Sequence, residues 1–181
     1  MMPKWTKTIT ASVSISFLLF DRFSNMCLAN CLEPMRAANT LVGCDFYNWR
    51  FLSLKGQTVL SSSGLPVLPQ GKLGDMAPCD YLFIITSYDY LMHDTAQCRK
   101  ALQDSARKSK TMVGLDTGPW LMASSGLLEG RRATLHWETI DSFSEKFLNI
   151  DTLRHRVVRD GNRITCAGAM SAFDLTRSMI E

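Results

Sequence analysis

One stretch, residues 115–137 (LDTGPWLMASSGLLEGRRATLHW), limits the possible folds of this chain more than any other. An apolar run leads into it, Asp116-Thr117-Gly118-Pro119 predicts a tight turn, and residues 120–128 have helical spacing. Pro119 suits a first helical turn, because its missing N–H would have no partner there. A short strand should then bring His136 back toward the turn. The stretch therefore predicts a strand, a sharp turn and a helix, with Asp116 at the positive end of that helix.

Apolar runs that are typical of buried strands alternate with amphipathic helices along the chain. Residues 81–86 are almost all apolar, as in a parallel sheet covered on both faces. Further strands are predicted at 13–20, 46–54 and 58–61, and helices from Asn25, over 95–109 and over the last dozen residues. Asp160-Gly161 between two apolar pairs predicts a β-hairpin. We therefore expect one α/β domain over residues 1–181, a three-layer sandwich around a mostly parallel sheet, plus that hairpin.

Composition and charge favour a cytoplasmic protein that does not bind DNA through this chain. Lys4 and Lys7 precede an apolar run like that of a signal peptide, but Ser and Thr interrupt the run and it is too short to span a bilayer. We expect neither export nor a membrane segment. The six cysteines form no CxxC pair, fit a reducing compartment and are all expected to be buried. The net charge of +3 comes without a basic stripe.

Three segments carry a resemblance to a known family. They are EPMRAAN (33–39), GLLEGRRATLHW (126–137) and ITCAGAMSAFDL (164–175), and they resemble the N-terminal sensor domain of GlxA-type transcriptional regulators of the AraC family. This domain lies in the ThiJ/PfpI superfamily, with the flavodoxin-like fold of class I glutamine amidotransferases. The resemblance spans about Ser14 to Ile180. It implies a homodimer and a helix-turn-helix DNA-binding domain beyond residue 181, so DNA would be bound only through that missing part.

The resemblance also shows what the chain lacks as an enzyme. Enzymes of the superfamily carry a cysteine nucleophile at the turn, an acidic residue early in the first helix and a histidine just past the next strand. Here these places hold Asp116, the pair Met26 and Cys27, and His136. A helix N-terminus activates a thiol but only holds a carboxylate in its ionised form. We therefore expect no enzymatic activity.

Two readings of Asp116 stay open, and a covalent aspartyl nucleophile is a remote third. Asp116 is either an N-cap bonded to the amides that follow it, with its pKa lowered by the helix end, or a carboxylate facing a ligand. His136 is either a structural histidine or a pocket residue that bonds Asp116 or a ligand.

The leading hypothesis is a sensor domain that binds a small effector, such as an amine or an amino acid. The ligand-binding candidates are Asp116, Thr117, Gly118, His136, Ser87 and Tyr88, with Trp120, Trp137 or Tyr88 as aromatic neighbours for a cation. The sequence predicts no catalytic residue, metal or cofactor. The alternatives are a PfpI-like hydrolase, whether amidase, peptidase or glyoxalase-like, and a dimerisation scaffold with a vestigial pocket.

Overall fold

A seven-stranded sheet forms the centre of the molecule in the computed structural model, which describes residues 12–180. Its strand order is β10-β11-β7-β6-β1-β2-β5, and every neighbouring pair is parallel except β10 and β11. The strands are β1 (Val13–Leu19), β2 (Tyr47–Ser53), β5 (Gly71–Lys72), β6 (Cys79–Thr86), β7 (Ser109–Asp116), β10 (Val157–Asp160) and β11 (Arg163–Cys166). Two small ribbons pair β3 (Val59–Leu60) with β4 (Pro66–Val67), and β8 (Arg132–Ala133) with β9 (Asp151–Thr152).

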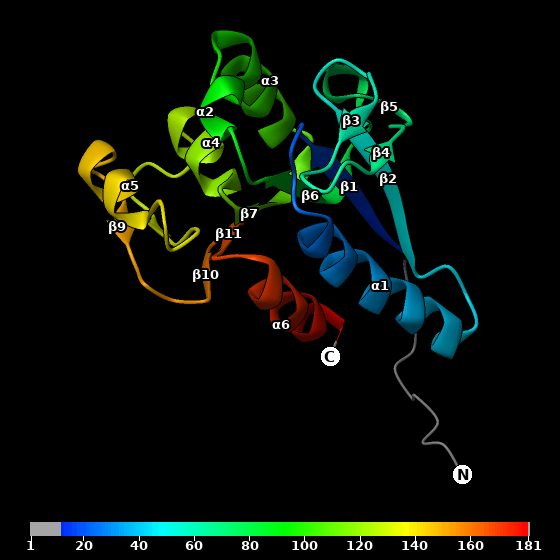
Figure 1. Ribbon diagram of the computed structural model, residues 1–181. Coiled ribbons are helices and arrows are strands. Elements are labelled where there is room, and N and C mark those ends of the chain that lie inside the picture. Colours follow the sequence, from blue (N-terminus) through cyan, green and yellow to red (C-terminus); the bar gives the residue numbers. More distant parts are fainter. Residues whose placement is uncertain (1–11, 181) are drawn as a thin grey trace.

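Helices cover both faces of this sheet (Figure 1). On one face lie α1 (Asn25–Val42) and α6 (Ala169–Ile180), and on the other lie α2 (Tyr90–His93), α3 (Ala96–Ala106) and α4 (Gly118–Ser124). A peripheral helix, α5 (Ile140–Lys146), packs by Phe143 on the α4 side, and a 3-10 turn spans Leu73–Asp75. The predicted three-layer sandwich with a mostly parallel sheet is confirmed, and so is the hairpin, formed by β10 and β11.

Two apolar clusters fill the spaces between the layers, because successive side chains of a strand point to opposite faces. Phe17 and Phe83, paired across β1 and β6, face α1 and α6. Their neighbours Leu18 and Ile84 face α3 and α4. All four side chains are fully buried, so β1 and β6 are the interior strands of the domain.

The first helix begins and ends with side-chain and backbone caps. Ser24 is its N-cap and accepts a hydrogen bond from the Cys27 N–H, and Gly43 ends it in the left-handed conformation. The helix runs through Pro34 without ending there. Its buried residues are Cys27, Leu28, Cys31 and Met35.

Some sequence predictions were wrong in detail. The helix after the turn ends at Ser124 instead of continuing to residue 128, because Gly126 has a φ of 71° and leaves the helical path. Helix α3 ends at Ala106, and Ser109 already belongs to β7. Five cysteines are buried as predicted, but Cys44 is exposed. Among residues 12–180, no helix combines the length and apolar character needed to cross a membrane.

Candidate functional site

The predicted turn at Asp116 is a strained elbow between β7 and α4. Asp116 ends the strand with a φ of 61°, a left-handed conformation that non-glycine residues seldom adopt and that is enriched at functional sites. Thr117 is the N-cap of α4, and Gly118 is its first residue. A Cβ atom on Gly118 would lie 2.4 Å from the Ile84 carbonyl oxygen, so only glycine allows the helix to start this close to β6. Backbone packing therefore fixes the position of Asp116.

The Asp116 carboxylate is held by side chains from two other elements. Its Oδ2 accepts a hydrogen bond from the Ser87 hydroxyl at 2.8 Å and lies 3.9 Å from the Cys27 Sγ. Its Oδ1 has no hydrogen-bond partner within the described part of the chain. The residue is 8% exposed, so this second oxygen is the atom left for a ligand. The N-cap reading of Asp116 is wrong, since Thr117 holds that position and the Asp116 carboxylate bonds Ser87 instead.

The pKa of Asp116 also differs from the sequence expectation. Burial raises it above the ordinary 3.8, because an ionised carboxylate loses solvation inside the protein. The Ser87 hydrogen bond, the charge of His136 and the Cys27 thiol act in the opposite direction but do not outweigh burial. We expected the helix end to lower this pKa. The expectation was wrong because the carboxylate does not bond the first amides of α4.

Residues beside the elbow are tied into the backbone around it. The Thr117 N–H donates to the Thr86 carbonyl at 3.2 Å, and the Thr117 hydroxyl donates to the Ser87 carbonyl at 2.9 Å. Thr117, a ligand-binding candidate in the sequence, thus has both its amide and its hydroxyl in use within the protein. Gly118 is packed against the Ile84 carbonyl, so it contributes no side chain to the site and leaves no free space where a side chain would be.

Ser87 connects the elbow to the loop between β1 and α1. Its hydroxyl donates to Asp116 and accepts a hydrogen bond from the Ser24 N–H at 3.0 Å. Ser24 in turn caps α1 and orients Cys27. Sequence reasoning missed the role of Ser24, although a serine directly before the predicted helix start is a recognised capping signal.

The Cys27 thiol enters the site from α1. Burial, followed by the nearby charge of Asp116, raises the pKa of Cys27 far above its ordinary value of 9.0. A thiol in this state stays protonated at neutral pH and is a poor nucleophile. In the sequence, Cys27 falls near the position of the superfamily's acidic residue. This correspondence is the signal that could have predicted the contact between Cys27 and Asp116.

His136 borders the same cluster through its backbone. The His136 N–H donates to the Asp116 carbonyl at 2.9 Å, while its ring Nδ1 accepts a hydrogen bond from the Glu138 N–H at 3.4 Å. The side chain is 27% exposed. No hydrogen bond joins its imidazole to the Asp116 carboxylate among residues 12–180. The Glu138 carboxylate also lies 3.8 Å from the Nδ1, so the Nε2 is the ring nitrogen left for a ligand.

Of the three aromatic residues proposed as cation partners, one lies in the core and two lie on the surface. Trp120 is in the core, where its ring packs edge-on against Tyr90, Phe143 and Phe147. Tyr88 is exposed and lies beneath the Arg22 guanidinium. Trp137 is also exposed and stacks loosely on His136. The geometry thus places Trp120 in a structural role and leaves Tyr88 and Trp137 on the surface near the site.

Comparisons with known proteins find one family and several transcriptional regulators that this chain resembles. The model of the DJ-1/PfpI family matches residues 13–181. The HTH-type transcriptional regulator CdhR of Pseudomonas aeruginosa is 38% identical over 164 residues, which cover 91% of this chain and 48% of the regulator. The HTH-type transcriptional regulator GlxA of Rhizobium meliloti is 33% identical over 167 residues, covering 92% of this chain and 52% of that protein.

A solved structure shows the same fold. The crystal structure of an AraC family transcriptional regulator from Pseudomonas putida superposes with a TM-score of 0.79 at 23% identity, covering 93% of this chain and 90% of the other. The chain spans about half the length of the curated relatives named above.

Proposed function

The chain belongs to the DJ-1/PfpI family, and from this premise we propose that it is the non-catalytic, effector-binding part of an AraC-type transcriptional regulator. The names of its relatives support this assignment, since both are HTH-type regulators. Because the chain spans about half of these relatives, we propose that residues 1–181 form the sensor and that a helix-turn-helix domain beyond residue 181 binds DNA. A cytoplasmic location follows from this role.

The observation that carries the proposal is the chemistry of the elbow. Its residue is a buried carboxyl, Asp116, and the nearest thiol, Cys27, belongs to α1 and has a raised pKa. Superfamily enzymes have the opposite arrangement, with the thiol at the elbow and the acid on the helix. In this chain neither group supplies a thiolate at the point where a substrate would be attacked. The site around Asp116 is therefore suited to bind a ligand and not to react with it.

We propose that the effector contacts Asp116 through its free Oδ1 and His136 through the Nε2 of its half-buried imidazole. Ser87 holds the carboxylate in place, Gly118 lets α4 begin close to β6, and Tyr88, next to Ser87 in the sequence, is exposed. A carboxylate with one unbonded oxygen favours a ligand that donates hydrogen bonds, such as a primary amine or an amino acid. Neither a cofactor nor a metal takes part in this proposal.

Isothermal titration of the purified chain with a panel of amines and amino acids tests this function. We expect a saturable signal for at least one ligand and about a tenfold loss of affinity in Asp116→Asn, because a charge-assisted hydrogen bond becomes a neutral one. Ser124→Ala, on α4 and bonded to Asp94, is the matched control and should bind normally. Equal affinity in Asp116→Asn and the wild type would refute the assignment of Asp116.

A hydrolase is the second candidate, favoured by the strained backbone at Asp116 together with a histidine beside it. It predicts turnover of amide, ester or glyoxal substrates that disappears in His136→Ala. The regulator predicts no turnover in any of these assays. Multiple turnovers by the purified chain, abolished in His136→Ala, would replace the sensor proposal by the hydrolase.

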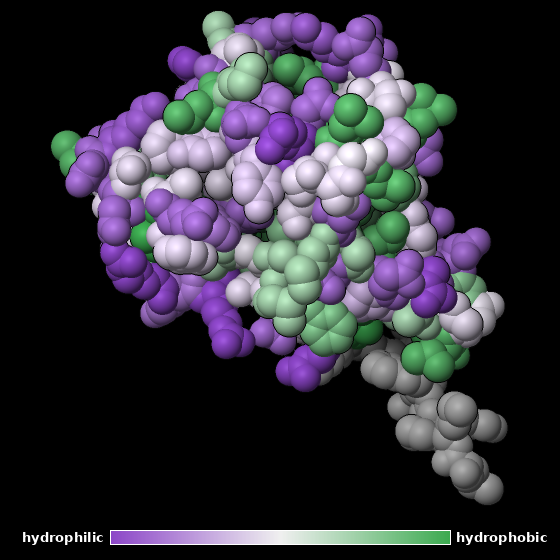
Figure 2. Space-filling view, in the orientation of Figure 1, coloured by the Kyte–Doolittle hydropathy of each residue, from purple (hydrophilic) through white to green (hydrophobic). Residues whose placement is uncertain are grey.

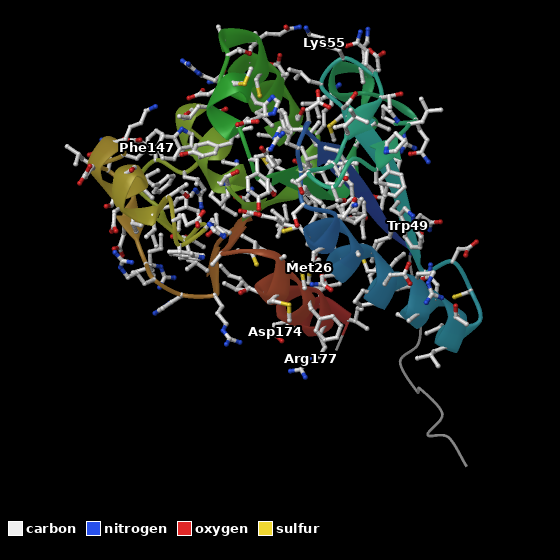
Figure 3. The ribbon with its side chains drawn as sticks, viewed as in Figure 1. Met26, Trp49, Lys55, Phe147, Asp174 and Arg177 are labelled. Atoms are coloured by element: carbon white, nitrogen blue, oxygen red, sulfur yellow. The ribbon has the colours of Figure 1, made fainter. Side chains whose placement is uncertain are left out.

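We further propose that the chain forms a homodimer through the outer face of α1 and α6. Three large apolar side chains are exposed there, Met26 (50%), Met170 (68%) and Phe173 (45%). The space-filling view shows an apolar patch over α6 and the start of α1 (Figure 2), and Met26 and Asp174 lie on this side of the molecule (Figure 3). Sedimentation velocity should show a dimer that Phe173→Glu dissociates and Leu148→Glu, at an exposed apolar residue elsewhere, does not. A monomeric wild type would contradict it.

A further inference from the structure

A group of cationic side chains lies at the amino edge of the sheet, on the side of the domain opposite the elbow. Lys108 directly precedes β7, Lys110 is the second residue of β7, and Arg163 is the first residue of β11. Since neighbouring parallel strands begin at the same edge, these residues share that edge. Asp116, in contrast, ends β7 at the carboxyl edge. The cations are therefore a feature separate from the proposed effector site.

A polar cavity of about 690 Å³ lies at this edge. Its lining includes the cations Arg107, Lys108 and Lys110 and one carboxylate, Asp80. Lys110 pairs with Asp80, and Arg107 pairs with Asp104 outside the lining. The Lys108 ammonium instead donates to the backbone carbonyls of residues 74 and 76, at 3.1 and 3.3 Å, and no carboxylate pairs with it within residues 12–180. The cavity therefore carries a positive charge that the protein does not balance.

Three guanidinium groups gather around one carboxylate at the turn of the β10–β11 hairpin, and we call this group the hairpin cluster. The Arg131 Nη1 and the Arg132 Nε lie 3.8 and 3.7 Å from the carboxylate oxygens of Asp160. Arg163 lies opposite Asp160 in the hairpin and is 9% exposed. Its guanidinium donates to the backbone carbonyls of residues 127 and 162, at 3.2 and 3.1 Å. No carboxylate forms an ion pair with Arg163 in the described part of the chain.

The burial of Arg163 next to Arg131 points to an anion that the chain itself does not supply. Burial, followed by the positive charge of Arg131, lowers the pKa of Arg163. Buried charges are ordinarily paired with an opposite charge, because an unpaired one loses its solvation without compensation. Asn162 lines the cavity and directly precedes Arg163, and its side-chain amide has no hydrogen-bond partner among residues 12–180. The cavity and the hairpin cluster therefore form one continuous surface for anions.

Helix α6 ends at this same edge. It follows β11 and runs back along the sheet, and the Met179 carbonyl accepts a hydrogen bond at 3.5 Å from the hydroxyl of Tyr47, the first residue of β2. Ser178 accepts a hydrogen bond from the Arg159 guanidinium of β10 at 2.7 Å. Arg159 is exposed and has no carboxylate partner within residues 12–180. The DNA-binding domain proposed beyond residue 181 therefore begins beside these cations.

We propose that this edge, from Lys108 to the hairpin cluster and Arg159, binds the phosphate backbone of duplex DNA. The choice of DNA rests on the proposed function, because the following domain would hold a duplex next to these cations. Phosphates repeat along a duplex, so they match several separated cations better than one small anion does. Such contacts add affinity without sequence preference. In the sequence these cations lie in three separate segments, so no basic stripe was visible and DNA binding was expected only from the further domain.

Fluorescence anisotropy of a labelled DNA duplex tests the proposal with the purified chain. At about 50 mM salt we expect saturable binding, with similar affinities for duplexes of unrelated sequence. If the edge contacts about three phosphates, the logarithm of the association constant should fall against the logarithm of the salt concentration with a slope of about −3, because each contact releases roughly one counterion. Absence of binding at this salt concentration, or a slope near zero, would overturn the proposal.

Substitutions locate the contact. The double variant Arg131→Gln, Arg132→Gln should weaken binding at least about tenfold and make the salt slope shallower by about 2. Asp160→Asn should tighten binding about threefold, because it removes the carboxylate of the hairpin cluster, and a folding defect does not explain a gain. The matched control Lys55→Gln, Lys72→Gln removes the same charge elsewhere and should bind normally; Figure 3 shows Lys55 at the end of the molecule away from the end of α6. Equal losses in the two double variants, or weaker binding of Asp160→Asn, would refute the site.

Competitors separate DNA from other phosphates. At constant ionic strength, inorganic phosphate and AMP on the order of 1 mM should not displace the duplex, and an RNA duplex of the same length should not bind more tightly. Displacement by either small phosphate would assign the edge to a small ligand, and tighter RNA binding would assign it to RNA, so each result overturns the proposal. The amine titration reads Asp116 and does not involve this edge. Loss of DNA binding with normal amine binding would therefore overturn this inference alone, and the reverse would overturn the effector site alone.

Discussion

The Sγ of Cys27 lies 3.9 Å from the Oδ2 of Asp116, although 89 residues separate the two in the sequence. The contact joins the first helix to the elbow and pairs a thiol with a carboxyl group, both buried. The charge of Asp116 raises the pKa of Cys27, because two negative charges at this distance repel, whereas the neutral Cys27 thiol lowers the pKa of Asp116 by donating to its carboxylate. The Cys27 thiol therefore stays protonated beside the carboxyl group and is a poor nucleophile.

The raised pKa of Asp116 predicts a pH-dependent cost to stability. The folded state binds this proton more tightly than the unfolded chain, whose carboxyl has the ordinary pKa of 3.8. The stability gained from protonated Asp116 is complete below that value and is lost as the pH rises through the folded-state pKa. Urea unfolding should therefore show Asp116→Asn gaining stability relative to the wild type between about pH 4 and pH 7. A difference that stays constant with pH would contradict the burial of an ionisable carboxyl.

Asp80 should behave in the opposite way. The Lys110 ammonium and the N–H and hydroxyl of Ser14 donate to its carboxylate and hold its pKa at about 2. This stabilisation is present above the unfolded-state pKa of 3.8 and is lost as the pH falls through about 2. Asp80→Asn should destabilise the chain by about 1–3 kcal/mol at pH 7, and by less at low pH. Urea unfolding curves of the wild type and Asp80→Asn, at pH 7 and at low pH, measure this loss of stability. A loss that is equally large at low pH would disprove the assignment.

Gly118→Ala tests the close approach of α4 to β6. The new methyl group would lie 2.4 Å from the Ile84 carbonyl oxygen, and backbone at this position cannot move aside without displacing the sheet. We expect a loss of about 1–3 kcal/mol or more in the free energy of unfolding. Gly74→Ala is the matched control, because nothing lies within 4 Å of its added Cβ, and it should change stability by less than about 0.5 kcal/mol. Equal melting temperatures for the two variants would refute the packing argument.

Thiol reactivity should distinguish the six cysteines. Cys44 is exposed, whereas Cys27 is buried with a strongly raised pKa, and burial raises the pKa of Cys31 and Cys98 to about 12. Because the thiolate is the reactive form, iodoacetamide at neutral pH should label Cys44 first in the folded chain. Mass spectrometry of the labelled peptides gives the order. Labelling of Cys27 as fast as Cys44 would show a reactive thiol at the elbow and would support the hydrolase.

The sequence was sufficient to predict the elements with the strongest patterns. The apolar run of β6 and the Asp160-Gly161 turn of the hairpin determine their structures locally, and both were predicted correctly. The strand–turn–helix around Asp116 also formed as expected, since a glycine and a proline at fixed positions allow few other conformations. Helix α2 was missed because four residues are too few to show a helical period.

The candidate site was less predictable, because its contacts are tertiary. Nothing in the sequence near Asp116 shows that Ser87 and Cys27, from two other elements, meet at one of its oxygens. The pKa of Asp116 was expected to fall because the local pattern contains a helix start, but burial, a property of the whole fold, determines the direction.

The central sheet ends in short strands at both edges, two residues in β5 and four in β10. Short edges offer few unpaired backbone groups to a strand from another molecule, which limits fibre-like growth of the sheet. Short edges therefore favour association of copies through helix faces, as proposed for α1 and α6, over pairing of sheet edges. Such contacts can be re-formed when subunits rotate against each other, whereas an intermolecular strand pair fixes their orientation residue by residue.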